Sequence, residues 1–202
     1  MTEPSDPPHW RRAQVLSLLA AALRPPIDSD SFRKTVEDLS RAVAGDKDLE
    51  GAIHKAAVLA RDLRADREYH RLFMGPGRPP APPFESVYRG GLVFGPAARD
   101  FLLELRRDGL EPVPDFRLPP DHISLELEYL AHLECRAVTA RAEGRPDDAA
   151  HWDGRAREFV DRHLARWIPD FRRRLDAAAP DSPYALIARA VTAVAGLEPE
   201  GR

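Results

Sequence analysis

The chain has 202 residues, of which 31% are charged, and a formal net charge of -3 at pH 7. This length allows one domain with a sizeable hydrophobic core. Because acidic and basic residues nearly balance, nucleic-acid binding by general phosphate neutralisation is not expected. The single cysteine, Cys135, excludes a disulfide framework and a cysteine-rich metal site, and we interpret it as a small apolar residue.

The N-terminal region joins an acidic, proline-rich start to an apolar run. Residues 1–8 are expected to be disordered, and residues 10–24 to form the first helix. Trp10-Arg11-Arg12 before the run superficially resembles a twin-arginine export signal, but an export signal needs a positive start and a small-residue cleavage site. The run is also too short to span a bilayer. We therefore expect a core helix, in a soluble and cytoplasmic protein.

Helical periodicity continues through the first half of the chain. A second helix is expected over about 28–44, where polar residues at the start offer caps, and a third over 48–66. A short helical turn near 67–73 leads into the Gly/Pro-rich segment 75–83, which is the main break in periodicity. The next helix is expected to open at Gly95-Pro96.

The second half begins with an irregular proline-bearing loop, 111–119, which is a candidate hinge. A long helix is expected from Pro120 to Glu143, since proline in the first turn loses no helical hydrogen bond. Further helices are expected over 147–166 and 170–179, separated by a kink, and from 183 to about 196.

The sequence has no alternating strand pattern of useful length and no internal repeat. It therefore predicts an all-α protein in which residues 1–202 form one helical bundle domain. A bundle does not need an aromatic-rich proline turn, as in 69–88, or an Asp-His pair at a helix start, as in 119–128. These two segments are the candidates for function.

The sequence motifs of common enzymes are missing. His122 and Glu126 are four residues apart, but there is no HExxH pair and no repeated Glu-x-x-His motif, so no metal site is expected. Gly75-Pro76-Gly77 lacks the Gly-Lys-Ser/Thr of a phosphate loop, and no Gly-x-Ser-x-Gly elbow occurs. We expect no catalytic residue. We interpret His132 and His163 as structural histidines, for which a backbone carbonyl is the expected partner.

The two candidate segments combine apolar and acidic residues. Tyr69, Leu72 and Phe73 are expected to project from one side of a helical turn. Asp121, Leu125 and Glu128 are expected to share one stripe of the long helix. Such a surface suits a peptide that carries arginines beside a hydrophobic stretch. Two alternatives remain open: the apolar residues belong to the core, or the aspartate only caps its helix.

Five segments follow one another in a recognisable order between about residues 65 and 171. They are Tyr69-x-x-Leu72-Phe73-x-Gly75-Pro76, Pro82-Pro83-Phe84-Glu85-Ser86-Val87-Tyr88, Phe94-Gly95, Pro120-Asp121-His122-Ile123 with Glu126, and His163-Leu164-x-x-Trp167-x-Pro169-x-Phe171. In this order they resemble the TorD/DmsD/NarJ family of redox-enzyme maturation chaperones. Gly77 stands where some relatives have an aromatic residue, and Tyr69 and Phe84 stand where the DmsD branch has tryptophans, which leaves the particular client open.

The resemblance implies an all-helical cytoplasmic chaperone of the TorD-like fold. Such proteins bind the catalytic subunit of a molybdopterin oxidoreductase, often through its twin-arginine signal peptide, until molybdopterin guanine dinucleotide is inserted. The chaperone itself is expected to need no cofactor, although some relatives bind guanine nucleotide weakly. A monomer or a domain-swapped dimer is expected. The residues that the resemblance assigns to client binding are Tyr69, Leu72, Phe73, Phe84, Tyr88, Gly95, Pro120, Asp121, His122 and Glu126.

The expected mechanism is physical holding of the client. The apolar stretch of the signal peptide would lie against Leu72 and Phe73, while Asp121, with Glu126 or Glu128, would pair with its arginines. Removing the aspartate is expected to weaken client binding with little loss of helix.

Histidine titrates near neutral pH, so protonation of His122 is expected to tune the site. Two other functions stay open. One is a general helical adaptor or regulatory binding protein without signal-peptide specificity. The other, less favoured, is an enzyme that uses Asp121 and His122 as an acid–base pair.

Overall fold

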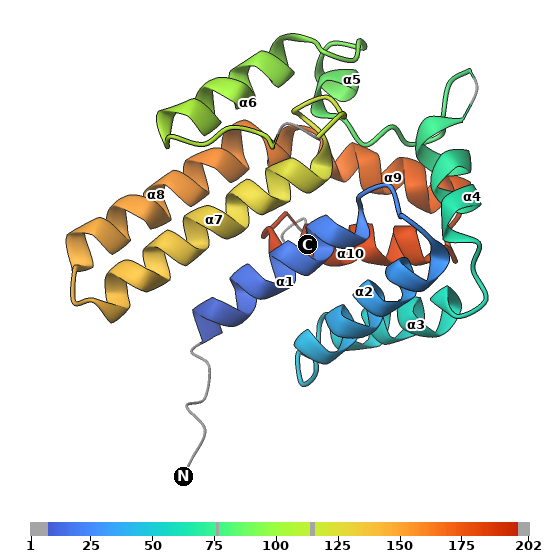
Figure 1. Cartoon of the computed structure of the whole chain (residues 1–202), viewed down its shortest axis with the longest axis horizontal. Coiled ribbons are helices and arrows are strands. Elements are labelled where there is room, and N and C mark those ends of the chain that lie inside the picture. Colours follow the sequence, from blue (N-terminus) through green and yellow to red (C-terminus); the bar gives the residue numbers. More distant parts are fainter. Residues whose placement is uncertain (1–7, 76, 114–115, 198–202) are drawn as a thin grey trace, which may run out of the picture.

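The computed structural model describes residues 8–75, 77–113 and 116–197, which are largely helical (Figure 1). Within these ranges no strand forms, and only an isolated antiparallel bridge joins Phe84 to His122. The expected all-α class is therefore confirmed. Residues 1–7 of the segment expected to be disordered, and 114–115 of the candidate hinge, lie outside the described residues.

The chain opens with helices α1 (Pro8–Ala22), α2 (Ser29–Ala42) and α3 (Glu50–Ala60). The side chain of Asp28 caps α2 by accepting a hydrogen bond of 2.7 Å from the backbone N–H of Ser31. Helical spacing then places the apolar residues of α2 on one buried face, as the sequence predicts. α1 and α3 both pack against α2.

The next region is more broken than expected. The short helix α4 (Ala65–Tyr69) continues directly into a π-helical turn, η1 (His70–Met74). The chain then folds back, with the N–H of Ala81 donating to the carbonyl of Leu72 at 3.0 Å. The sequence did not predict α5 (Glu85–Arg89), because five residues are too few for a periodic signal.

Helix α6 (Pro96–Arg107) begins at the expected Gly-Pro pair. It is followed by a long antiparallel pair, α7 (Ile123–Ala142) and α8 (Pro146–Arg162). α7 begins later than predicted, because a turn joins the N–H of His122 to the carbonyl of Pro119 at 3.1 Å. Asp121 therefore lies outside the helix, and the expected helical stripe from Asp121 to Leu125 is wrong.

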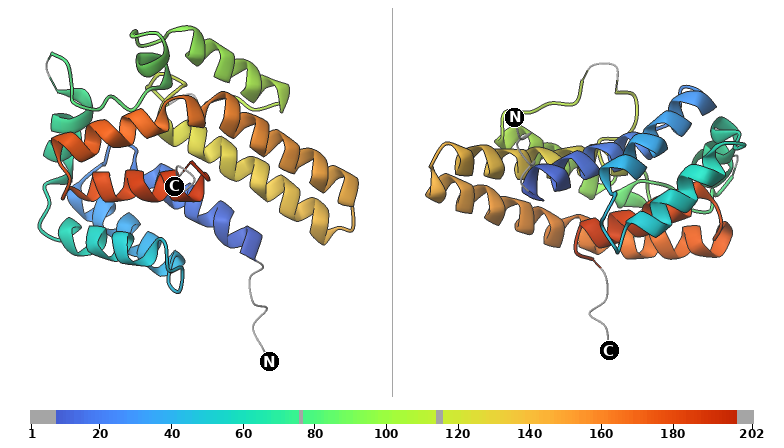
Figure 2. Two further views of the ribbon diagram at one scale, coloured as in Figure 1. Left: turned by 180° about the vertical axis from the view of Figure 1, so that it is seen from behind. Right: turned by 90° about the horizontal axis from the view of Figure 1, so that it is seen from below.

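The chain closes with a 3-10 turn, η2 (Leu164–Arg166), and helices α9 (Ile168–Ala178) and α10 (Pro183–Val194). The kink predicted near residue 167 is confirmed. α10 contacts α1, α3 and α9, and most of its side chains are buried. Figure 2 shows the α7–α8 pair extending away from the end of the molecule that holds α2, α3 and α4. None of the described helices combines the length and apolar character needed to cross a membrane.

Candidate functional site

The two segments singled out in the sequence meet in the structure. The strand-like residues before α5 run antiparallel to the turn before α7. The N–H of Glu85 donates to the carbonyl of Asp121 at 3.1 Å, and the N–H of Ile123 donates to the carbonyl of Pro83 at 3.0 Å. Between these bonds the rings of Phe84 and His122 meet edge to face, with centroids 5.3 Å apart. The starts of α5 and α7 are thus held together by backbone bonds.

Asp121 is fully buried and caps a helix other than its own. Its Oδ2 accepts a hydrogen bond of 2.7 Å from the backbone N–H of Ser86, in the first turn of α5. Burial raises the pKa of the Asp121 carboxyl above its ordinary value, although the hydrogen bonds from Ser86 oppose the shift. The alternative that this aspartate acts as a cap is therefore observed, but across to the neighbouring helix.

His122 is the N-cap of α7 and is also fully buried. Its Nδ1 lies 3.2 Å from the backbone N of Ser124 and 2.8 Å from the Oγ of the same residue. A backbone N–H can only donate, so Nδ1 is the acceptor and the proton of the neutral ring is on Nε2. That nitrogen lies 3.1 Å from the hydroxyl oxygen of Tyr69 and donates to it.

The surroundings of His122 disfavour its charged form. Burial, and after it the positive charge of Arg24, lower the pKa of the imidazole to about 3. Protonation near neutral pH, which the sequence suggested as a way of tuning the site, is therefore contradicted by the position of the ring.

The aromatic turn lies in the core. The side chains of Tyr69, Leu72 and Phe73 are only 2%, 0% and 1% exposed. The rings of Tyr69 and Phe73 lie 4.8 Å apart, and Phe73 lies 5.2 Å from Tyr184 on α10. The expectation that these residues line an open apolar groove is wrong, and the alternative that they belong to the core is observed.

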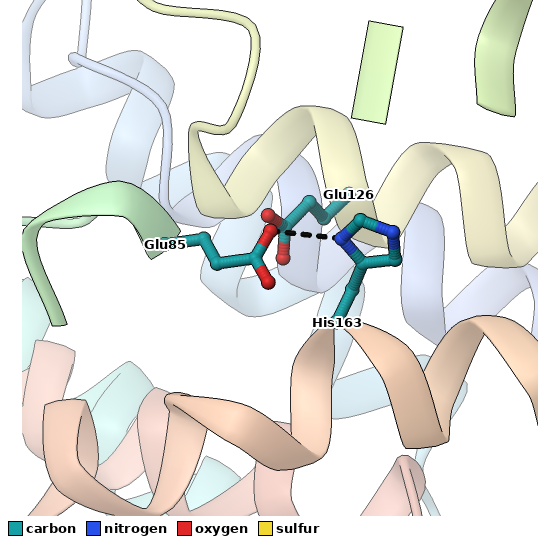
Figure 3. Close-up of side chains that lie close together, drawn as sticks. All are labelled: Glu85, Glu126 and His163. Atoms are coloured by element: carbon teal, nitrogen blue, oxygen red, sulfur yellow. Dashed lines mark hydrogen bonds and ion pairs between the residues drawn. The ribbon is translucent and has the colours of Figure 1, made fainter. Parts of the chain in front are cut away.

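Glu126 belongs to a buried cluster of polar side chains that also includes Glu85 and His163. Its Oε2 accepts a hydrogen bond of 3.0 Å from the indole N–H of Trp167. Beside it, Glu85 Oε2 lies 2.8 Å from His163 Nδ1, and Glu85 Oε1 accepts a 2.6 Å bond from Arg89 (Figure 3). Glu85, Glu126 and His163 are at most 2% exposed. None of these side chains is presented to a partner in this conformation.

The surroundings shift the pKa values of the two glutamates in opposite directions. Burial alone would raise the pKa of Glu85, but the bonds from His163 and Arg89 outweigh it and hold the pKa below its ordinary value. Burial, followed by the negative charge of Glu85, raises the pKa of Glu126 well above its ordinary value. The surroundings thus favour the charged form of Glu85 and the neutral form of Glu126 when no cation is bound.

The remaining predicted residues surround this cluster. Tyr88 is half-buried, with its ring 5.3 Å from that of Trp167 and the guanidinium of Arg174 4.5 Å above its face. Gly95 starts α6 where a Cβ atom would lie 3.2 Å from both the carbonyl of Leu92 and the Cβ of Ser86. This close approach explains the glycine. Pro120 is half-buried in the turn before α7.

The sequence did not predict the partners of these residues. Glu85 and His163 are separated by 78 positions, and Glu126 and Trp167 by 41, so no local pattern could pair them. The structural role expected for His163 agrees with its burial, but its partner is a carboxylate rather than a backbone carbonyl. One signal was available: Glu126 interrupts an apolar helical face in which Ile123 and Leu127 are fully buried.

The fold and the cluster define an all-helical protein whose polar centre braces the starts of two helices. They do not define a solvent-open catalytic centre among the described residues. A family model described as "Nitrate reductase delta subunit" matches residues 29–173, and the chain belongs to that family.

Curated relatives carry chaperone names, in agreement with the resemblance seen in the sequence. The chain is 51% identical over 71 residues to "Selenate reductase assembly chaperone protein" of Thauera selenatis, a match covering 35% of each chain. It is 49% identical over 63 residues to "Chlorate reductase assembly chaperone protein" of Ideonella dechloratans, covering 31% of this chain and 32% of the relative. These matches span about a third of each relative's length.

A longer match joins the chain to "Chaperone protein TorD" of Vibrio cholerae, at 26% identity over 170 residues, covering 84% of this chain and 70% of the relative. Among solved structures, a redox enzyme maturation protein from Archaeoglobus fulgidus superposes with a TM-score of 0.58. That match covers 94% of this chain and 96% of the other, at 20% sequence identity, and it shows that the two share a fold.

Proposed function

We propose that this protein is a cytoplasmic chaperone for the catalytic subunit of a molybdopterin oxidoreductase. It binds the subunit through the twin-arginine signal peptide or the cofactor-free body, and supports cofactor insertion before assembly or export. The observation that carries this proposal is the family match over residues 29–173. The names of the selenate and chlorate reductase chaperones support it. In this proposal the molybdenum cofactor belongs to the client, and the chaperone is not an enzyme.

The Asp-His pair acts in this function by positioning. Asp121 and His122 have no exposed surface, so a peptide cannot reach them without local opening. Both side chains hold helix starts, and they fix the surface formed by α5, the loop after it and the start of α7. Their burial also gives a substrate no access in this conformation, which speaks against the acid–base enzyme.

Two exposed features of the described residues suit a signal peptide. Glu128 is the one of the three carboxylates named in the expected mechanism that reaches solvent, with a side chain 35% exposed and paired to Arg24. The loop after α5 exposes apolar side chains, with Leu92 at 72% and Phe94 at 70%. Phe94 also has a φ angle of 62°, which is unusual for a residue with a side chain. We assign the arginine contact to Glu128 and the apolar contact to this loop.

The test is a binding titration with a fluorescent twin-arginine peptide and its double Arg-to-Ala version. The arginine peptide should bind at least about tenfold more tightly. Glu128→Gln should weaken its binding about fivefold, since an exposed ion pair contributes about 1 kcal/mol. The matched control is Glu143→Gln, an exposed carboxylate at the far end of the same helix, which should change nothing.

Equal binding of the two peptides would reject the signal-peptide contact and favour the general adaptor. Co-purification with the catalytic subunit lacking its signal then becomes the deciding measurement, because the proposal still requires binding to the body. A protein that binds neither peptide nor subunit is not a chaperone of this client class.

A further inference from the structure

The buried cluster offers three metal-binding atoms from three different elements. The three residues are Glu85 on α5, Glu126 on α7 and His163 at the end of α8. Each offers one ligand atom, and these atoms lie within 4.8 Å of one another. Figure 3 shows the three side chains converging. A small shift of each would bring the atoms to the distance of about 2.0–2.2 Å at which imidazole nitrogen and carboxylate oxygen bind a transition metal.

The bonds around the cluster hold the outer oxygen of each carboxylate. Arg89 holds Glu85 Oε1 and Trp167 holds Glu126 Oε2. Glu85 Oε2 and His163 Nδ1 now bond each other at 2.8 Å, so a metal ion would take the place of the proton between them, while Glu126 Oε1 supplies the third ligand. Donors that hold the outer atoms of metal-binding side chains are the usual second layer of a metal site.

A separate observation points to a missing partner. Glu126 is 0% exposed, and its Oε1 has no hydrogen-bond partner among the residues that the structure describes. Leaving a buried polar atom unpaired is unfavourable, so this oxygen needs either a proton that it shares with a neighbour or a cation.

We propose that Glu85, Glu126 and His163 form a buried binding site for one divalent transition-metal cation. Two carboxylates neutralise the charge of such a cation, and the imidazole favours a transition metal over magnesium or calcium. The nearby charge of Arg89 is tolerable because its side chain is 39% exposed and part of its field is screened by water. The site departs from the metal-free expectation of the sequence, because its ligands are not close together in the chain. It does not depend on the proposed chaperone function.

The test uses zinc ions and the full chain. The protein is unfolded in urea that contains EDTA and then freed of EDTA. It is refolded with or without zinc chloride, freed of loose metal by gel filtration and assayed for zinc by atomic emission. Refolding gives a fully buried site access to the ion. We expect about one zinc ion per chain and a higher melting temperature than for the protein refolded without zinc, since a ligand of the native state stabilises it.

Three variants identify the site. Glu126→Gln keeps the volume and the acceptor for Trp167 but removes a charged ligand, and should lower zinc affinity by at least about a hundredfold. Trp167→Phe removes only the orienting N–H and should lower it by about tenfold. His151→Gln, an exposed histidine on α8 near Asp147 and Asp148, is the control for surface binding and should leave the affinity unchanged.

The proposal is overturned if the refolded protein holds no zinc, in which case Glu126 and Glu85 share a proton instead. It is also overturned if Glu126→Gln, with native helix content by circular dichroism, retains zinc, or if His151→Gln loses it. Should Glu126→Gln not fold, Trp167→Phe decides: unchanged zinc affinity in that variant rejects the site.

Discussion

His122 stabilises the protein in its neutral form. The ring accepts a bond from Ser124 through Nδ1, so a second proton could be added only at the nitrogen that caps α7. Protonation would therefore break the cap and place an unpaired charge in a buried position. Burial, followed by the positive charge of Arg24, lowers the pKa of the ring to about 3, from a starting value of 6.5. The same histidine could not act as a sensor of neutral pH.

This has a measurable consequence for stability. Below about pH 6.5 the unfolded chain takes up a proton on His122 that the folded protein does not accept until about pH 3. Above pH 6.5 the depressed pKa therefore has no effect on the free energy of unfolding. As the pH falls from 6.5 toward 3, it lowers that free energy. The loss is about 1.4 kcal/mol per pH unit, or about 2 kcal/mol between pH 6.5 and 5.

The measurement compares urea unfolding of the wild type and His122→Asn between about pH 7.5 and 5. Asparagine keeps a capping oxygen but does not titrate. The free-energy difference between the two proteins should shrink by about 2 kcal/mol at the acid end. All other titrating groups are common to both proteins, so parallel stability curves would show that His122 is not held neutral.

At the scale of elements, α5 depends on contacts outside itself. A helix of five residues cannot be stable alone, because nucleation is unfavourable and few bonds repay it. Asp121 supplies the cap, and the backbone bonds to residues 83 and 85 fix the direction of the chain. The sequence could not indicate this helix, whereas the amphipathic α2, with its capping Asp28, was predicted to within two residues at each end.

We expect Asp121→Ala to destabilise the protein by about 1–3 kcal/mol, since it leaves the buried N–H of Ser86 without an acceptor. This replaces the expectation of a harmless substitution, which assumed an exposed aspartate. Asp121→Asn retains an acceptor and should cost less. Native-state hydrogen exchange should show the loss of protection concentrated at Ser86 and its neighbours in α5. Protection lost evenly along α7 instead would mean that the aspartate supports its own helix.

At the scale of the whole molecule, the long helices were predictable and their pairing was not. Periodicity identified α7 and α8 as helices, because their apolar residues recur along one chain segment. The family resemblance assigned residues near 84 and near 121 to client binding, but nothing in the sequence indicated that residues 83–86 pair with 121–123. The burial of the resulting site depends on how helices from both halves of the chain pack around it, which no single segment encodes.

Helix α6 illustrates such a long-range connection. It meets the α7–α8 pair through Phe101, whose ring lies 5.7 Å from that of Tyr129, and through a network centred on Arg155 of α8. Arg155 is 7% exposed, donates to Asp108 at 2.8 Å after the end of α6, and donates to the hydroxyl of Tyr129 on α7 at 2.8 Å. One guanidinium thus joins three elements.

We expect Arg155→Met to lower the free energy of unfolding by about 3–5 kcal/mol. The substitution keeps apolar packing but leaves the Asp108 carboxylate, with a side chain only 4% exposed, buried without its positive partner, so that only the Tyr129 hydroxyl still donates to it. Arg145→Met at the start of α8 is the matched control, because that arginine also bonds two carboxylates but in solvent, and should change stability by less than about 1 kcal/mol. Urea unfolding measures both. Equal effects would mean that the Arg155 network is no stronger than a surface ion pair.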